Sequence, residues 1–186
     1  MAQQKFKLTD PILSHAAENI SKTTDSSRTV TIQISNYSGN FILRNPRYYI
    51  LSGLNISPPP TIIEQDMAAV MTFVKTPLVP RGCVGLLTYE IFEERERKAT
   101  RSLAAMFSNP FDYNLYNIWF AVGFAFADED CDENLFNEMY HEEGDGRFSR
   151  AKASNEISHT ACNVEIKAKM TALPNSVLKI EVHDLY

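Results

Sequence analysis

Cysteine is scarce in this 186-residue chain, and its three cysteines are far apart: Cys83, Cys131 and Cys162. An odd number at such spacings predicts neither a disulfide framework nor a zinc site. Cys83 and Cys162 fall on the apolar faces of expected strands. We therefore predict that both are buried as small hydrophobic side chains.

Positive charge is also in deficit. The chain has 18 Lys and Arg residues against 23 Asp and Glu residues, which gives a formal net charge of −5. A nucleic-acid-binding surface needs clustered positive charge, so we expect no nucleic-acid partner. A zwitterionic or neutral ligand fits this charge balance better.

Catalytic and metal-binding motifs are missing as well. The four histidines are scattered, and there is no nucleophile elbow or phosphate-binding glycine loop, so we expect no enzyme, no catalytic residue and no cofactor. The spacing of Asp128, Asp130 and Asp132 imitates the opening of a calcium loop. However, Glu133 stands where that loop needs glycine, and Met139 stands where it needs a bidentate glutamate. No metal site is expected.

Long apolar runs do not occur. No run approaches the roughly 20 residues that a helix needs to cross a bilayer. The N-terminus also lacks the hydrophobic core of a secretory signal. The sequence therefore predicts a protein that is made soluble and then released, either without a cleavable signal or after the signal has been removed.

The composition that is present suits one globular domain rich in strands. The chain is 44% hydrophobic and 11% aromatic, enough to close a core. Apolar and polar residues alternate in many short segments separated by turn-forming residues, which predicts a mainly β protein, a β-sandwich flanked by two α-helices. The expected strands span residues 28–34, 41–44, 48–54, 68–74, 82–92, 100–107, 118–127, 161–170 and 177–182.

The first expected helix follows a loose segment, residues 1–9. Asp10 is suited to cap the helix and Pro11 to fill its first position. The apolar stripe of this helix consists of Ile12, Leu13, Ala16, Ala17 and Ile20. The second expected helix spans residues 130–141, where Leu135 with Met139 and Phe136 with Tyr140 pair at i, i+4.

An aromatic segment, residues 108–120 (SNPFDYNLYNIWF), lies between two expected strands. Its turn-formers predict a surface loop in which Tyr113, Tyr116 and Trp119 recur every three residues. Rings that converge in this way can bind a quaternary ammonium group through cation–π attraction. The spacing fits equally well a minor core beneath a long loop, so both interpretations stay open at this point.

Three blocks of the chain together resemble the actinoporins, pore-forming cytolysins of sea anemones. They are GCVGLLTYEIF (82–92), SLAAMFSNPFDYNLYNIWF (102–120) and ENLFNEMYHE (133–142). The resemblance implies an N-terminal amphipathic, membrane-inserting segment at 1–27 and a β-sandwich membrane-binding domain at 28–186. It also implies binding to phosphocholine headgroups of sphingomyelin, a monomer in solution, a homo-oligomer on the membrane and a cation-permeable pore lined by the first helix.

The resemblance also implies a binding site, residue by residue. The phosphocholine site would consist of Ser52, Val84, Ser108, Pro110, Tyr116, Phe136, Tyr140 and His141. Tyr116, Phe136 and Tyr140 would offer ring faces to the choline. Ser52, Ser108 and His141 could bind the phosphate. The membrane-interface residues would be Tyr113, Leu115 and Trp119.

Several positions depart from the family pattern. Phe136 and His141 replace tyrosines, and Leu115 replaces a tryptophan. Residues 143–145 read Glu-Gly-Asp where many relatives carry Arg-Gly-Asp, and further apolar residues ahead of the first helix are missing. The alternative function is therefore a non-lytic, lectin-like or headgroup-binding module of the same fold.

Overall fold

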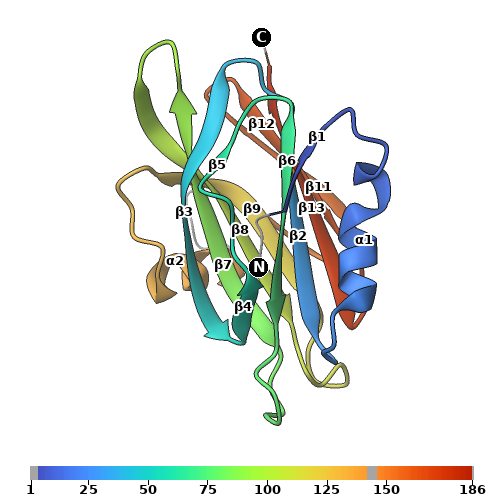
Figure 1. The fold of residues 1–186 in the computed structure, drawn as a ribbon. Helices are drawn as coiled ribbons and strands as arrows, with labels where there is room; N and C mark the ends of the chain where they lie inside the picture. The colour runs from blue at the N-terminus through green and yellow to red at the C-terminus, as the bar shows by residue number, and fades with distance from the viewer. Residues whose placement is uncertain (1–3, 142–145, 186) are drawn as a thin grey trace.

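The structure, a computed structural model, describes residues 4–141 and 146–185. Its architecture is two β-sheets packed face to face, with one helix on the outer face of each sheet (Figure 1). The Glu-Gly-Asp tripeptide at 143–145 lies outside the described residues. The mainly β fold and the sandwich flanked by two helices confirm the fold class predicted from the sequence.

Sheet one runs in the order β1-β6-β2-β13-β12-β11, and β4 also pairs with β6. Its strands are antiparallel except for the parallel pair of β2 and β13. The bounds are β1 (Gln4–Lys7), β6 (Met67–Val74), β2 (Thr29–Asn36), β13 (Asn175–Asp184), β12 (Val164–Met170), β11 (Glu156–Ala161) and β4 (Leu54–Ser57).

Sheet two runs in the order β10-β9-β8-β7-β3-β5, and every neighbouring pair is antiparallel. The bounds are β10 (Phe148–Lys152), β9 (Trp119–Phe126), β8 (Lys98–Asn109), β7 (Cys83–Glu93), β3 (Phe41–Ser52) and β5 (Ile62–Ile63). The main core fills the space between the sheets and includes the fully buried rings of Phe73, Tyr89, Phe107 and Phe120.

The helix α1 (Leu13–Thr23) packs on the outer face of sheet one. Ala17 lies against Val70 and Val177, and Phe6 and Ile20 pack around them. Because α1 covers this face, the polar residues of β2 are buried together with its apolar ones. The alternation of polar and apolar residues in β2 therefore does not produce a solvent-exposed face of this strand.

The N-terminal segment differs from the prediction in two ways. Residues 4–7 are not loose but form β1, which pairs with Met67–Val70 of β6. The helix begins at Leu13 because Asp10 forms a turn ahead of it, accepting a hydrogen bond from the Ile12 N–H (3.0 Å). Ile12, predicted to lie on the apolar stripe, is 61% exposed.

The helix α2 (Glu133–His141) packs on the outer face of sheet two. It begins three residues later than predicted because Asp132 acts as its cap, accepting a hydrogen bond from the Leu135 N–H (3.1 Å). Leu135, Phe136 and Met139 are its buried residues. Their small partners on the sheet include Ala104 and Ala121, which let the helix approach closely.

Other differences concern strand boundaries and one cysteine. The strands expected at 41–44 and 48–54 form a single strand, β3, with an irregularity between Arg44 and Arg47. β4, β5, β10 and β11 were not predicted. Cys83 is buried as predicted, but the prediction for Cys162 is wrong: this cysteine is exposed in the turn before β12, with φ 46°.

Candidate functional site

Four residues form a row across sheet two, at the edge where β3 and β8 end and β7 and β9 begin. Ser52 is the register partner of Val84, Val84 of Ser108, and Ser108 of Trp119. Residues that are directly opposite on neighbouring strands point to the same face. Val84 and Trp119 pack against the α2 cluster, which places the row on the helix-covered face.

The helix α2 adds stacked rings above this row. Phe136 and Tyr140 are stacked with centroids 5.7 Å apart, and Tyr49 of β3 lies 6.3 Å from Phe136 on a tilted plane. Phe136 is only 3% exposed. It is therefore placed to support Tyr140, which is half-buried, and offers little ring surface of its own to a ligand.

Hydroxyl groups of the row are partly engaged. The Ser52 hydroxyl donates a hydrogen bond to the Gly82 carbonyl (3.0 Å). Ser108 and Pro110 are buried, whereas His141 is exposed at the end of α2. Of the residues expected to contact phosphate, His141 is the most accessible to a ligand arriving from solvent.

Arg28 holds the aromatic loop in place. Its Nε donates to the Pro110 carbonyl (2.9 Å) and its Nη2 donates to the Phe111 carbonyl (2.6 Å). The guanidinium also stacks on the Tyr113 ring, 4.4 Å from its centroid. Tyr113 in turn donates to Asn109 Oδ1 (2.8 Å). These contacts fix the first half of the loop.

The second half of the loop projects outward. Leu115 is 70% exposed and Tyr116 is 59% exposed, while their backbone N–H groups donate to the Asp112 carbonyl. Among the described residues, no ring pair joins Tyr116 to the rings of α2. The structure thus brings Ser52, Val84, Ser108, Trp119, Phe136 and Tyr140 together, and places Tyr116 at an open rim.

Arg150 links Trp119 to α2. Its guanidinium lies 4.2 Å from the Trp119 ring centroid, and its Nη1 donates to the Tyr140 carbonyl. Lys152 also approaches the indole, at 5.5 Å. Trp119 is therefore half-buried and covered by cations, which leaves Leu115 and Tyr116 as the more accessible residues for a lipid interface.

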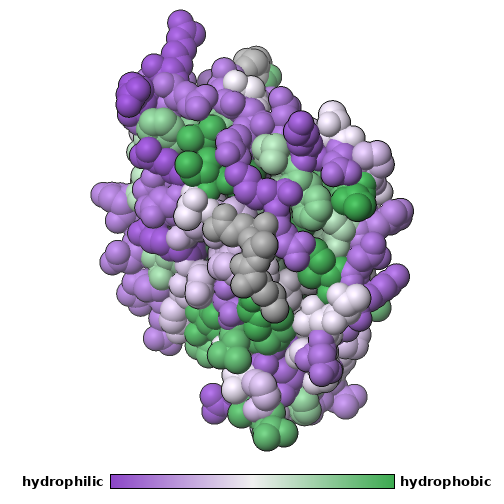
Figure 2. Space-filling model, viewed as in Figure 1, coloured by the Kyte–Doolittle hydropathy of each residue, from purple (hydrophilic) through white to green (hydrophobic). Residues whose placement is uncertain are grey.

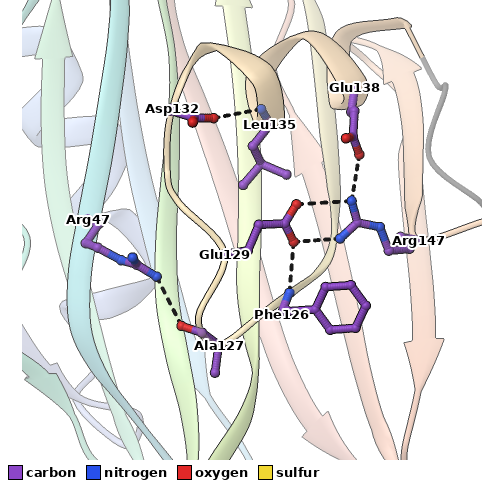
Figure 3. Close-up of polar contacts among 8 residues, drawn as sticks. All are labelled: Arg47, Phe126, Ala127, Glu129, Asp132, Leu135, Glu138 and Arg147. Carbon is purple, nitrogen blue, oxygen red and sulfur yellow. Dashed lines mark hydrogen bonds and ion pairs between the residues drawn. The ribbon is translucent and has the colours of Figure 1, made fainter.

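Arg147 ties α2 to the loop that precedes it (Figure 3). Its guanidinium donates to both oxygens of Glu129 (2.7 and 3.2 Å) and to Glu138 of α2 (2.6 Å). Partial burial raises the pKa of Glu129, but hydrogen bonds from Arg147 and from the Phe126 N–H outweigh it, so the pKa lies below its usual value.

The lowered pKa of Glu129 predicts acid lability. The Glu129 carboxylate binds a proton more readily in the unfolded chain than in the folded one. Its contribution to the free energy of unfolding is therefore complete above the ordinary glutamate pKa and is lost as the pH falls through the lower pKa of the folded state. Replacing Arg147 with Met should lower the free energy of unfolding by about 1–2 kcal/mol at pH 7, because solvent partly screens the network. Denaturant unfolding at pH 7 and pH 3.5 tests this. R147M should lose less stability than the wild type on acidification, and an equal loss in both would contradict the assignment.

A cavity of about 700 Å³ lies elsewhere, on the outer face of sheet one beside the start of α1. Lysine and glutamate side chains of β11, β12 and β13 line much of it, together with Gln33 and Ser35. Some charged groups at its edge are already paired, as in the ion pair of Glu18 with Lys179 (2.5 Å). It shares no residue with the row on sheet two, and none of its lining groups is an aromatic ring.

Sequence reasoning missed three residues of the site: Arg28, Tyr49 and Arg150. Tyr49 had a detectable signal, since it follows Tyr48 in an alternating strand and must face the side opposite to it. Arg28 and Arg150 had none, because their partners are distant in the sequence. Among the described residues, no cluster of three or more His, Cys, Asp or Glu side chains is placed to hold a metal ion.

The family described as sea anemone cytotoxic protein matches residues 4–184. DELTA-alicitoxin-Pse1b from Phyllodiscus semoni is 35% identical over 115 residues, 61% of this chain and 48% of that protein. Bryoporin from Physcomitrium patens is 24% identical over 155 residues, 83% of each chain. The matched region thus spans about half the length of the first of these relatives.

A solved structure shares the fold. The lipid binding protein Nakanori superposes with a TM-score of 0.66 over 92% of this chain and 77% of that protein, at 12% sequence identity. Neither helix in the described part of this chain has the length and apolar character that a membrane span requires.

Proposed function

Because this chain belongs to the sea anemone cytotoxic protein family, we propose that it binds phosphocholine headgroups of sphingomyelin-containing membranes, oligomerises there and inserts its N-terminal segment as a pore-lining helix. The observation that carries this proposal is the surface formed by Tyr140, Trp119 and the Ser52–Val84–Ser108 row beneath the projecting aromatic loop. Tyr140 would supply a ring to the choline cation. His141 would bind the phosphate, together with the Ser52 hydroxyl once it turns from the Gly82 carbonyl to the ligand.

The packing of α1 on sheet one supports the proposal that this helix can detach from the sheet. In the described protein, α1 buries Leu13, Ala16, Ala17 and Ser21, and its polar links to sheet one are the Glu18–Lys179 ion pair and the Ser21 hydroxyl donating to the Asn175 carbonyl (3.0 Å). Leu13 is the one large side chain in this set, and burying alanine removes little apolar area from water, so α1 docking contributes less per residue than α2 docking, which buries Leu135, Phe136 and Met139.

The alternative is a module of the same fold that binds a headgroup or sugar without perforating the membrane. What favours it is β1, whose pairing with β6 must also be broken before the segment can extend. The two functions differ in leakage and agree in binding, so one assay that measures both separates them.

The test uses dye-loaded vesicles of three compositions: phosphatidylcholine with sphingomyelin, phosphatidylcholine alone, and phosphatidylglycerol. We expect binding and dye release to be strongest with sphingomyelin. We expect them to be weakest with phosphatidylglycerol, because acidic residues 128–133 repel an anionic surface. Binding without release would favour the module. Equal binding to phosphatidylglycerol and sphingomyelin vesicles would contradict headgroup recognition.

A further inference from the structure

The β6–β7 loop (residues 75–82) ends in a hydrophobic side chain that no described residue covers. Leu78, at its tip, is 102% exposed. Its backbone lies in the left-handed region with φ 61°, which a leucine rarely adopts. Exposed Pro77 and Pro80 flank the tip and restrict the backbone on either side. The loop therefore holds an apolar side chain outward in a fixed, unfavourable conformation.

This loop lies beside the aromatic loop. Cys83, where β7 begins, pairs with Asn109, where β8 ends. Gly82 is so close to the start of the aromatic loop that a Cβ there would lie 2.1 Å from the Asn109 carbonyl oxygen and 2.8 Å from Pro110 Cα. The Lys75 ammonium is 5.7 Å from the Phe111 ring centroid. Both loops therefore project from the same end of the sandwich, the lower end in Figure 1.

A further hydrophobic edge adjoins the loop. Leu51 and Leu54 are both exposed at the β3–β4 turn, which the Ser52 hydroxyl ties to the Gly82 carbonyl. Figure 2 shows hydrophobic surface at the lower tip of the molecule and in a patch above it. With Leu115 and Tyr116 of the aromatic loop, these side chains form an interrupted apolar rim at one end of the protein.

Charge indicates which partner suits this rim. The loop sequence KTPLVPRG contains two basic residues, buried Lys75 and exposed Arg81, and no acidic one, although the whole chain has a net charge of −5. Arg81 is exposed beside the tip. A lipid surface fits this arrangement, because leucine can enter the acyl boundary while an arginine stays at the level of the phosphates.

We propose that the β6–β7 loop is a second membrane anchor, in which Leu78 enters the interface of a phosphocholine lipid surface alongside the aromatic loop and Arg81 contacts lipid phosphate. This inference rests on the proposed membrane-binding function and adds a contact that does not use the headgroup site. Its failure can be distinguished from failure of that function, because headgroup binding would remain if only the anchor were wrong.

The chain offers a direct probe because it contains a single tryptophan, Trp119. The double variant W119F/L78W moves the only indole to the loop tip, and W119F alone is its matched reference for vesicle binding, because Trp119 belongs to the proposed headgroup surface and phenylalanine keeps a ring beside Arg150. On binding to phosphatidylcholine–sphingomyelin vesicles, its emission should shift to the blue and be quenched by lipids brominated on the acyl chain. If this variant co-sediments with vesicles but its emission is neither shifted nor quenched, the anchor is wrong while the proposed function stands. If the wild type does not co-sediment, both are wrong.

A substitution pair measures the contribution of the leucine. L78S should weaken partition into the same vesicles by about tenfold. The serine side chain loses most of the free energy that leucine gains on transfer from water to the apolar boundary of the membrane. L185S is the matched control: Leu185 is also exposed but lies near the C-terminus at the opposite end, so its partition should match the wild type. If L78S instead leaves partition unchanged and alters only self-association in solution, the loop contacts a second copy and the proposal is overturned.

Discussion

Joining α1 covalently to sheet one is expected to abolish vesicle leakage while leaving vesicle binding intact. The variant carries Glu18→Cys and Lys179→Cys, which replace an ion pair whose atoms lie 2.5 Å apart. Cys131 and Cys162 are changed to Ser so that a short bis-maleimide reacts only at the new pair. Cys83 is buried and unreactive, and burial raises the pKa of its thiol to about 12.

The effect should be large because the membrane step needs the whole segment. Lipid-exposed backbone is stable only as a helix or a closed barrel, so a helix held on the sheet cannot line a pore, and leakage should fall by about 100-fold or more. The same variant without the cross-linker is the matched control. Removal of residues 1–27 should give the same loss. It also strips β1 and uncovers Val70 and Val177, so the truncated chain must first be shown to fold by circular dichroism.

Cross-linked protein that still releases dye would show that α1 does not line the pore. Cross-linked protein that neither binds nor leaks would point to a role of α1 in docking to the membrane. Both results would contradict the division into a membrane-inserting segment and a membrane-binding domain, because that division assigns binding to the sandwich alone.

Replacing Tyr140 with Ala is expected to give the second large effect, a loss of sphingomyelin-vesicle binding of about tenfold or more. The half-buried ring of Tyr140 is stacked on Phe136, and its backbone carbonyl accepts from Arg150. A desolvated cation over such a ring is worth about 2 kcal/mol, which is lost with the ring. Tyr140→Phe keeps the ring face and should bind nearly as well as the wild type.

The control for this prediction is Tyr37, a tyrosine that is 45% exposed. It stacks on His183 with centroids 4.9 Å apart, in a part of sheet one remote from the row. Tyr37→Ala should leave vesicle binding unchanged. Thermal unfolding of each variant separates a lost ligand contact from a loosened helix. If Tyr140→Ala binds sphingomyelin vesicles as tightly as the wild type, the aromatic surface beside α2 is not the headgroup site.

Much of the fold followed from local pattern. Alternation of apolar and polar residues located β2, β12 and β13 to within a few residues, and short apolar runs located the central strands β7 and β8. The turn-formers of 109–112 placed the aromatic loop at the surface. β10 and β11 were missed because they are edge strands, and β11 has no buried residue. Such strands have no continuous apolar face to reveal them.

The candidate site followed from the family resemblance, and the structure brought most of its residues together. What the sequence could not show was which of them remain accessible. The burial of Phe136 depends on Tyr49 and on the small residues of β8 and β9, which are far away in the chain. The exposure of Leu78 depends equally on the absence of any described neighbour at the loop tip.

The sequence by itself determined the strand-rich composition, the two amphipathic helices and the aromatic loop, since periodicity and turn chemistry act between residues close along the chain. Only the tertiary structure decided that β1 anchors the N-terminal segment, that Arg28 and Arg150 hold the aromatic surface, and that Leu78 projects beside it. These features depend on contacts between side chains of separate strands. Such contacts cannot be inferred from any single stretch of the sequence, because the residues that make them are far apart along the chain.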